Sequence, residues 1–188
     1  MAYTELITTE RLVLRRWHAP THTPALAALN ALPEAVRFLN AGVPFTPEES
    51  AGQSARFAAH WDRYGFGLWA VEVAGACVGF TGLCHPLWFP AYASEVEIGR
   101  RLHPSAWGRG FATEAGRLAL ECGFAELGLE RVIACIDPDN RSSIAVADRL
   151  GLARGETVPE PSGPGQLVIY SIGAGTSSDK PERATASG

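Results

Sequence analysis

The stretch HPSAWGRGFATEAGRLAL, residues 103–120, decides the fold because it joins a glycine-rich turn to a helical pattern. Gly108 and Gly110 flank Arg109, and glycine permits backbone angles and close approaches that a β-carbon forbids. Small and apolar residues then recur at helical spacing as far as Gly128, which suits the C-terminal cap. The first N–H groups of a helix have no partner within it, so this turn predicts an anion site, with phosphate as the usual ligand.

The two most familiar phosphate-binding motifs do not match this turn. A P-loop requires the pattern GxxxxGK[ST], and Lys180, the single lysine of the chain, does not follow a glycine. A dinucleotide fingerprint requires GxGxxG, and Thr113 stands where its third glycine would be. On these grounds alone, the alternative that the two glycines only shape a turn stays open.

The neighbouring segments predict a strand before the turn, and a further strand and helix after it. SEVEIGRRL, residues 94–102, alternates in polarity and places Glu95 and Glu97 on one face. Downstream, RVIACID (131–137) predicts a buried strand, and DNRSSIAVADRLG (139–151) predicts a short helix.

The rest of the chain adds helices and hairpins. RLVLRRW (11–17) predicts a first strand, Thr23–Pro24 the start of a helix, and the capping box Thr46–Glu49 the start of a longer one. Hairpins are predicted around Ala74–Gly75 and around the loop 159–165. The predicted order is β-α-α-α-β-β-β-α-β-α-β-β, which gives a mixed sheet with helices packed on it.

Length and composition bound the class of protein. The 188 residues suffice for one domain, expected over residues 1–172, whereas residues 173–188 lack an apolar pattern and predict a flexible tail. A net charge of −4 argues against a general nucleic-acid binder. The sequence shows no signal peptide and no membrane-spanning apolar run, so we expect a soluble cytoplasmic protein. The four cysteines form no CxxC pair and have no zinc spacing, so no metal is expected.

Taken together, these segments resemble the GNAT acyltransferases, the superfamily that uses acetyl-coenzyme A. The family signature is Q/R-x-x-G-x-G/A, and residues 107–112 match it except that Trp107 replaces the leading Gln or Arg. That substitution, with TTERLVLRRW near the start and DPDNRSSIAVADRLGL downstream, resembles the RimJ/RimL branch, which acetylates protein N-termini and includes relatives with other substrates. The resemblance covers residues 6–172.

The resemblance implies a mixed α/β GNAT fold, with a mostly antiparallel sheet of six to seven strands, four to five flanking helices, and a splay between strands 4 and 5. In such proteins the pantetheine arm of acetyl-CoA lies along strand 4, here residues 94–102, and the pyrophosphate meets the N–H groups of the helix start. The residues implied to bind acetyl-CoA are Arg100, Leu102, Trp107, Gly108, Arg109, Gly110, Ala112, Thr113, Asn140 and Ser143.

Three of these residues keep a second interpretation. Asn140 opens a predicted helix, and its alternative role is a plain helix cap, which also suits Asn. For Ser143, the alternative is a hydroxyl that bonds the backbone of the first helical turn. For Arg109, the alternative is a solvated arginine on the surface.

The catalytic candidates are Glu97, Glu95 and Tyr170. By resemblance, Glu97 matches the strand-four glutamate that several GNAT branches use as base, and a carboxylate near the acceptor amine suffices to remove its proton. Glu95 would share the strand face of Glu97 and relay through water, and Tyr170 would protonate the leaving thiolate. The alternatives are a solvated strand face for the glutamates and a core position for the tyrosine.

The implied function is an N-acetyltransferase that moves an acetyl group from acetyl-CoA directly to a primary amine, either a protein N-terminus or a small molecule. A non-catalytic acyl-CoA-binding module, or a transferase for another acyl-CoA such as succinyl-CoA, is the alternative. Trp88, Phe89 and Tyr92 would line the acceptor site or form a homodimer interface. No metal, nucleic-acid or membrane partner is expected.

Overall fold

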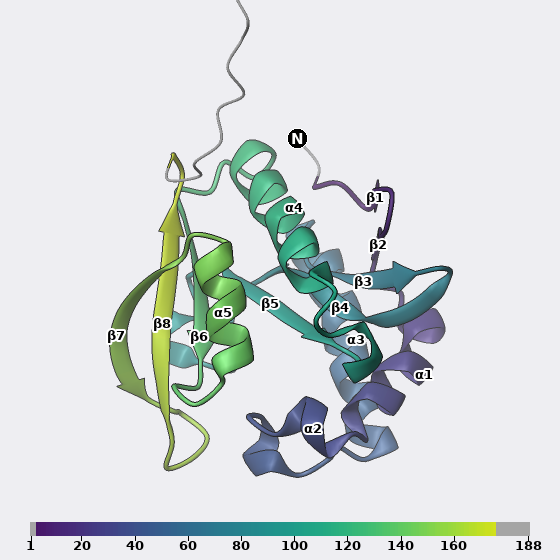
Figure 1. The fold of residues 1–188 in the computed structure, drawn as a ribbon, viewed down its shortest axis with the longest axis horizontal. Coiled ribbons are helices and arrows are strands. Elements are labelled where there is room, and N and C mark those ends of the chain that lie inside the picture. The colour runs from purple at the N-terminus through teal and green to yellow at the C-terminus, as the bar shows by residue number, and fades with distance from the viewer. Residues whose placement is uncertain (1–2, 176–188) are drawn as a thin grey trace, which may run out of the picture.

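A computed structural model of the chain describes residues 3–175, so most of the predicted tail lies outside the described residues. The strands form one sheet in the order β1-β2-β3-β4-β5-β6-β8-β7, with helices on both faces (Figure 1). The strands are β1 Leu6–Thr8, β2 Val13–Arg16, β3 Leu68–Val73, β4 Ala76–Cys84, β5 Glu97–Leu102, β6 Arg131–Ile136, β7 Ala153–Pro159 and β8 Gln166–Gly173. The helices are α1 Ala19–Asn30, α2 Pro33–Val36, α3 Pro47–Tyr64, α4 Phe111–Ala125 and α5 Arg141–Arg149.

The mixed, mostly antiparallel sheet and its flanking helices are confirmed. Within residues 3–175, β5 with β6 is the one parallel pair. The sheet has eight strands rather than six to seven because the short strand β1 pairs with β2, with Leu6 opposite Arg15. A strand of three residues is too short to show an alternating pattern, and the extra strand makes predicted strands 4 and 5 the observed β5 and β6.

The first helix begins earlier than predicted. α1 starts at Ala19 rather than at Thr23–Pro24, and Pro24 lies inside it. Pro20 already takes the favoured position in the first turn. The Thr23 hydroxyl donates to the Ala19 carbonyl at 2.6 Å, which satisfies one backbone acceptor of that turn. By contrast, α3 begins as predicted, because Thr46 and Glu49 form the expected capping box.

Different helices cover the two faces of the sheet. α4 packs on the face to which Ile98 belongs, since Ile98 lies against Gly116 of α4. α3 packs on the opposite face, where the rings of Phe57 and Phe80 are 4.9 Å apart.

No helix in the described part of the chain is long and apolar enough to cross a membrane. The main hydrophobic cluster holds three tryptophans that are almost fully buried, Trp17, Trp61 and Trp69.

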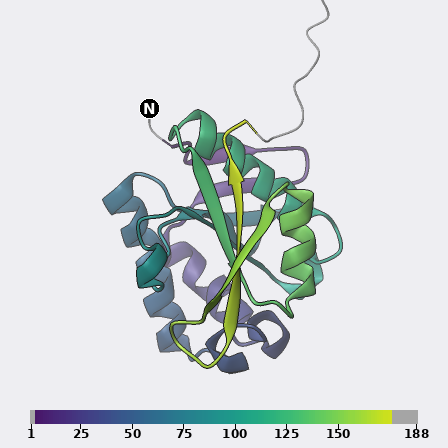
Figure 2. The same cartoon turned by 90° about the vertical axis from the view of Figure 1, so that its left-hand side faces the viewer.

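β5 and β6 part after a single point of contact. β5 pairs with β4 along its whole length but with β6 only at Glu97, opposite Ile133. At this contact the Ile133 N–H donates to the Val96 carbonyl at 2.9 Å. Figure 1 shows the strands diverging, β5 toward the start of α4 and β6 toward the start of α5. The splay implied by the resemblance is confirmed. Figure 2 shows the hairpin β7–β8 that extends the sheet beyond β6.

Candidate functional site

The turn before α4 has the glycine geometry that its sequence predicts. Gly108 has φ +70° and Gly110 has φ +80°, and L side chains rarely adopt such angles. A β-carbon on Gly108 would have open space around it, so the backbone angle is what calls for glycine here. Gly110 is the N-cap of α4 and has no side chain to bond the first N–H groups of the helix.

Five consecutive N–H groups lead into α4 without an acceptor. Across residues 3–175, no partner exists for the N–H groups of residues 108–112, which include the predicted donors Arg109, Gly110 and Ala112. Thr113, predicted as a fourth donor, instead donates its N–H to the Gly110 carbonyl at 3.1 Å. The Thr113 amide is therefore already satisfied by the helix itself, and the unpartnered donors lie one residue earlier than predicted.

The end of β5 and the turn are tied together by side chains of the predicted site. The indole N–H of Trp107 donates to the Leu102 carbonyl at 2.7 Å. Arg100 Nη2 donates to the carbonyl of Ser143 in α5 at 2.8 Å. Burial lowers the pKa of Arg100 to about 10, and the Glu97 carboxylate opposes that change. Arg100 thus joins β5 to the first turn of α5 from the strand that borders the splay.

Asn140 has the capping role that its position suggests. Its side-chain oxygen accepts from the Ser143 N–H at 3.1 Å and from the Ser142 hydroxyl at 2.9 Å. Within the described residues, both hydrogen bonds of the Asn140 side chain use its oxygen, and its NH₂ group has no acceptor. The cap therefore uses one end of the amide, and a contact of Asn140 or Ser143 with acetyl-CoA stays a prediction.

Glu97 lies at the point where β5 and β6 meet, and it is buried, with 9 % of its surface exposed. One carboxylate oxygen accepts from the Cys135 N–H at 3.3 Å, and the other accepts from the Trp88 indole N–H at 3.4 Å. Burial raises the pKa of Glu97, and the bonds from Cys135 and Trp88 and the charge of Arg100 partly oppose that rise. A carboxylate with a raised pKa is a stronger base once ionised, which suits proton removal from an amine.

Glu95 does not share the strand of Glu97. The predicted strand over residues 94–102 begins only at Glu97. Glu95 belongs to the preceding turn, in which its N–H donates to the Tyr92 carbonyl at 2.8 Å. Its carboxylate pairs with Arg131 at 3.4 Å. The strand alternation invoked for Glu95 is therefore wrong, because this turn breaks it.

Tyr170 and Glu97 lie on opposite faces of the sheet. Glu97 is in register with Ile133, and Tyr170 with Ala134, the next residue of β6. Successive residues of a strand point to opposite faces. Tyr170 is also buried in the main hydrophobic cluster, which is its predicted alternative position. Its role as a proton donor stays a prediction.

The aromatic loop after β4 divides between the core and the site. Phe89 is buried in a second hydrophobic cluster with Ile133 and Ile169. Trp88 is 48 % exposed and reaches the Glu97 carboxylate. The Tyr92 hydroxyl donates to Glu156 at 2.9 Å. Phe89 thus belongs to the hydrophobic core. Trp88 is the aromatic residue of this loop that contacts a candidate catalytic group.

Arg11 is a residue of the site that the sequence analysis did not single out. Its Nη1 donates to the Arg109 carbonyl at 3.2 Å, and its Nε donates to Glu114 at 2.9 Å. Its guanidinium also lies over the Phe111 ring, 5.1 Å from the centroid. Arg11 belongs to the stretch TTERLVLRRW that carries part of the family resemblance. Its contact with the turn joins residues about a hundred positions apart, and a local sequence pattern does not reveal such a contact.

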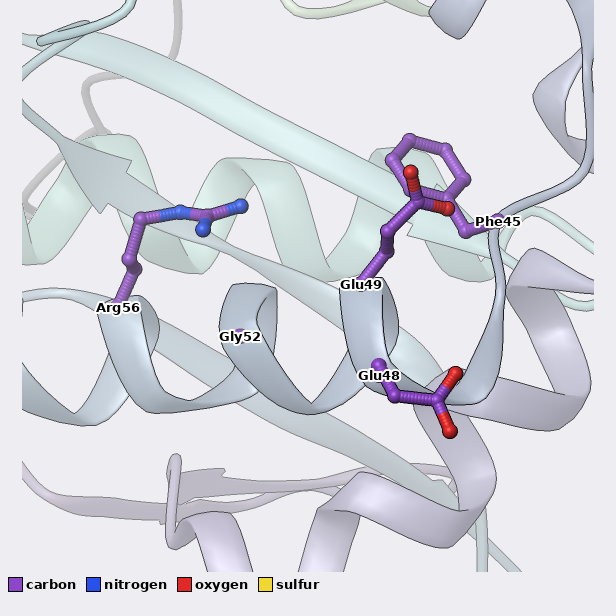
Figure 3. Close-up of a pocket in the computed structure, with 5 residues that line it drawn as sticks. All are labelled: Phe45, Glu48, Glu49, Gly52 and Arg56. Atoms are coloured by element: carbon purple, nitrogen blue, oxygen red, sulfur yellow. The ribbon is translucent and has the colours of Figure 1, made fainter.

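A hollow opens beside the start of α3. Its volume is about 470 Å³. Figure 3 shows Phe45, Glu49 and Arg56 pointing to one side of α3, with Gly52 between them and Glu48 turned away. The Phe45 ring lies 5.9 Å from the guanidinium of Arg101 on β5. No group of three His, Cys, Asp or Glu side chains within residues 3–175 would hold a metal ion.

Known proteins are similar to this chain in sequence and in fold. The family model "Acetyltransferase (GNAT) domain" matches residues 11–153. YkkB of Bacillus subtilis, an uncharacterized protein, is 33% identical over 112 residues, and the match spans 57% of this chain and 61% of YkkB.

Solved structures extend the likeness to nearly the whole described chain. An acetyltransferase from Agrobacterium tumefaciens has a TM-score of 0.75 and 30% identity, and the match covers 90% of this chain and 94% of that one. RimL, a ribosomal L7/L12 α-N-protein acetyltransferase in complex with coenzyme A, has a TM-score of 0.72 over 90% of this chain and 98% of its own. At 17% identity RimL shares the fold. Together with the family match over residues 11–153, these findings show that the chain belongs to the GNAT acetyltransferase family, whose members are acyl-CoA-dependent transferases.

Proposed function

We propose that this protein is an acetyl-CoA-dependent N-acetyltransferase that moves the acetyl group directly to a primary amine. The observation that carries the proposal is the run of unpartnered N–H groups at residues 108–112, set at the end of the splayed strand β5. Glu97, a buried carboxylate with a raised pKa, lies at the other end of that strand.

The donor side fits a CoA molecule. The N–H groups of residues 108–112 and the helix dipole of α4 favour a pyrophosphate. Among residues 3–175, the edge of β5 that faces the splay has no strand partner beyond Glu97, and it would accept an extended pantetheine arm as an added strand. RimL, which shares the fold, is solved in complex with coenzyme A, and this supports coenzyme A as the kind of ligand that such a fold binds. When bound, acetyl-CoA supplies the thioester that donates the acetyl group.

The acceptor side rests on Glu97. An α-amino group has a pKa of about 7.7–8.0, and a lysine amine has one of about 10.4, so most of the acceptor arrives protonated at neutral pH. The neutral amine is the nucleophile, and Glu97 takes its proton directly or through one water. The N–H groups of Cys135 and Trp88 hold the carboxylate in place for that step.

Direct transfer is favoured over an acyl-cysteine intermediate. Cys84 and Cys135 are the thiols whose pKa values respond to the charge of Glu97. Burial raises both thiol pKa values, and the Glu97 carboxylate raises them further. Both side chains therefore stay protonated at neutral pH, and a thiol is a poor nucleophile compared with a thiolate.

Calorimetry and mass spectrometry test the proposal. We expect the protein to bind CoA and acetyl-CoA but neither ATP nor NAD. With acetyl-CoA and a library of peptides and small amines, it should release free thiol and add 42 Da to an acceptor, a mass fixed by the acetyl group. Binding of CoA without transfer to any amine would favour the non-catalytic module. Transfer from succinyl-CoA in preference to acetyl-CoA would favour the other acyl donor.

A further inference from the structure

Arg11 holds the phosphate turn from outside the turn. It lies between β1 and β2, far from the turn in the sequence, and it contacts both the backbone of the turn and the first helical turn of α4. Nη1 donates to the Arg109 carbonyl at 3.2 Å. Nε and Nη2 both bond the same oxygen of Glu114. The other oxygen of Glu114 accepts from the Thr9 hydroxyl at 2.8 Å, so the short stretch 9–11 contacts both oxygens of this carboxylate.

The bond to the Arg109 carbonyl sets the direction of a predicted donor. The Arg109 carbonyl and the Gly110 N–H belong to one peptide unit, which is planar and trans, so they point in opposite directions. Drawing the carbonyl oxygen toward Arg11 therefore aims the Gly110 N–H to the other side of the turn. Gly110 has φ +80° and no side chain that would hold this peptide in place, so the outside contact supplies the restraint.

The pair with Glu114 removes an unfavourable charge from the turn. Glu114 is the acidic residue in the first turn of α4, within the same turn as the unpartnered N–H groups. A carboxylate there stabilises the helix dipole but repels a pyrophosphate. The Arg11 guanidinium compensates that charge, and it comes within 3.8 Å of the position that a β-carbon on Gly110 would take.

We propose that Arg11 is a positioning residue for the pyrophosphate of CoA, which orients the Gly110 N–H and neutralises Glu114 at the start of α4. The inference rests on the proposed function and adds to it a residue that lies outside the glycine turn. Arg11 acts through the backbone and through Glu114.

The test compares two arginines of the same surface setting. Arg11 pairs with Glu114, and their side chains are 50% and 23% exposed. Arg15 pairs with Glu72, and their side chains are 49% and 19% exposed, but Glu72 lies on β3, away from the turn. We expect Arg11→Gln to raise the Kd for CoA about tenfold, because a restrained donor and a compensated charge are both lost. Arg15→Gln also removes a half-exposed ion pair but should leave the Kd unchanged.

Rescue by a second substitution separates positioning from general stability. In the Arg11→Gln background, Glu114→Gln removes the carboxylate that Arg11 no longer neutralises and should restore part of the CoA affinity. The affinity that is not restored measures the loss of the Arg109 contact. Arg11→Lys keeps the charge but lacks the planar fork that reaches both partners, so its Kd should fall between those of the parent and Arg11→Gln. In turnover assays, Arg11→Gln should raise KM for acetyl-CoA while kcat stays unchanged.

Three outcomes overturn the inference. The first is an Arg11→Gln protein that binds CoA within twofold of the parent, and the second is an Arg15→Gln protein that loses as much affinity. The third is a double variant that shows no rescue and an Arg11→Lys protein that binds no better than Arg11→Gln. A parent protein that binds no CoA overturns the proposed function and this inference with it, so the two failures are told apart by the parent alone.

Discussion

At the level of single residues, the buried carboxylate of Glu97 sets the pH dependence of transfer. Because burial raises its pKa, the parent should lose kcat/KM as pH falls through a value above the ordinary carboxylate range. Glu97→Gln should keep the CoA affinity, lower turnover by roughly 10²–10⁴, and recover partly as rising pH deprotonates the amine. A pH series of kcat/KM checks this, and unchanged turnover of Glu97→Gln at neutral pH would mean that positioning alone drives the reaction.

Glu97 affects stability in the opposite direction: activity should rise with pH, whereas the free energy of unfolding should fall. A raised pKa means that the folded state binds the proton of Glu97 more tightly than the unfolded state does. The free energy of unfolding therefore falls as pH rises from the ordinary value near 4.5 to the raised value in the fold. Glu97→Gln has no such proton and should be more stable than the parent at neutral pH, with the difference vanishing below that window. Urea unfolding at several pH values measures it.

Gly108 offers a matched pair of substitutions for the anion site. Its φ of +70° is tolerated by Asn and Asp better than by other L residues, and its surroundings are open. Gly108→Asn and Gly108→Asp should therefore fold alike, and the added carboxylate of Asp should weaken CoA binding about tenfold more through repulsion of the pyrophosphate. Calorimetric titration with CoA compares them. Equal affinity of the two variants would place the pyrophosphate elsewhere.

At the level of elements, Asn30 holds α1, α3 and β5 together. It is fully buried at the end of α1, and its NH₂ group donates to Ser50 at 3.0 Å and to Gln53 at 2.9 Å. Its side-chain oxygen accepts from Arg101 of β5, whose pKa burial lowers to about 10 without a carboxylate to oppose it. The position of α3, and with it the hollow at Phe45, depends on this contact.

We therefore expect Asn30→Ala to lower the free energy of unfolding by about 2–4 kcal/mol, because it leaves buried polar groups unpaired. Asn30→Asp keeps an acceptor for Arg101 and adds a counter-charge, so it should cost less. Denaturant unfolding of the two variants checks the order. A smaller loss for the alanine variant than for the aspartate variant would contradict this account.

How far the sequence predicted these elements depends on how local their signals are. The signals for the capping box at Thr46, the two hairpin turns and the start of α4 each lie in a few adjacent residues, and the structure confirms these features. The start of α1 and the start of β5 were misplaced because a proline inside a helix and a turn at Glu95 each override the local pattern. Arg11, Trp88 and the Cys135 N–H reach the site through contacts distant in sequence, which periodicity does not encode.

At the level of the whole molecule, the loop after β4 presents two adjacent large apolar side chains to solvent. Leu87 is 55% exposed and Trp88 is 48% exposed. We expect this surface to support a homodimer, so light scattering should give a mass near twice the 20.0 kDa of one chain. Leu87→Asp should return the mass to that of one chain while leaving Trp88 and Glu97 in place. A monomer mass for the parent at high concentration would contradict the expectation.

Because β5 and β6 pair at a single point, a bound acyl-CoA would add to the contacts that hold the two parts of the sheet together. Strands β1 to β5 and strands β6 to β8 meet along the sheet only where Ile133 bonds Val96, so little backbone bonding resists a change in the angle between the two blocks. An acyl-CoA arm bound in the gap would contact both groups of strands and restrain the angle between them. Amide hydrogen exchange in β5, β6 and β8 should then slow together when CoA is added, whereas β1 to β3 keep their rates.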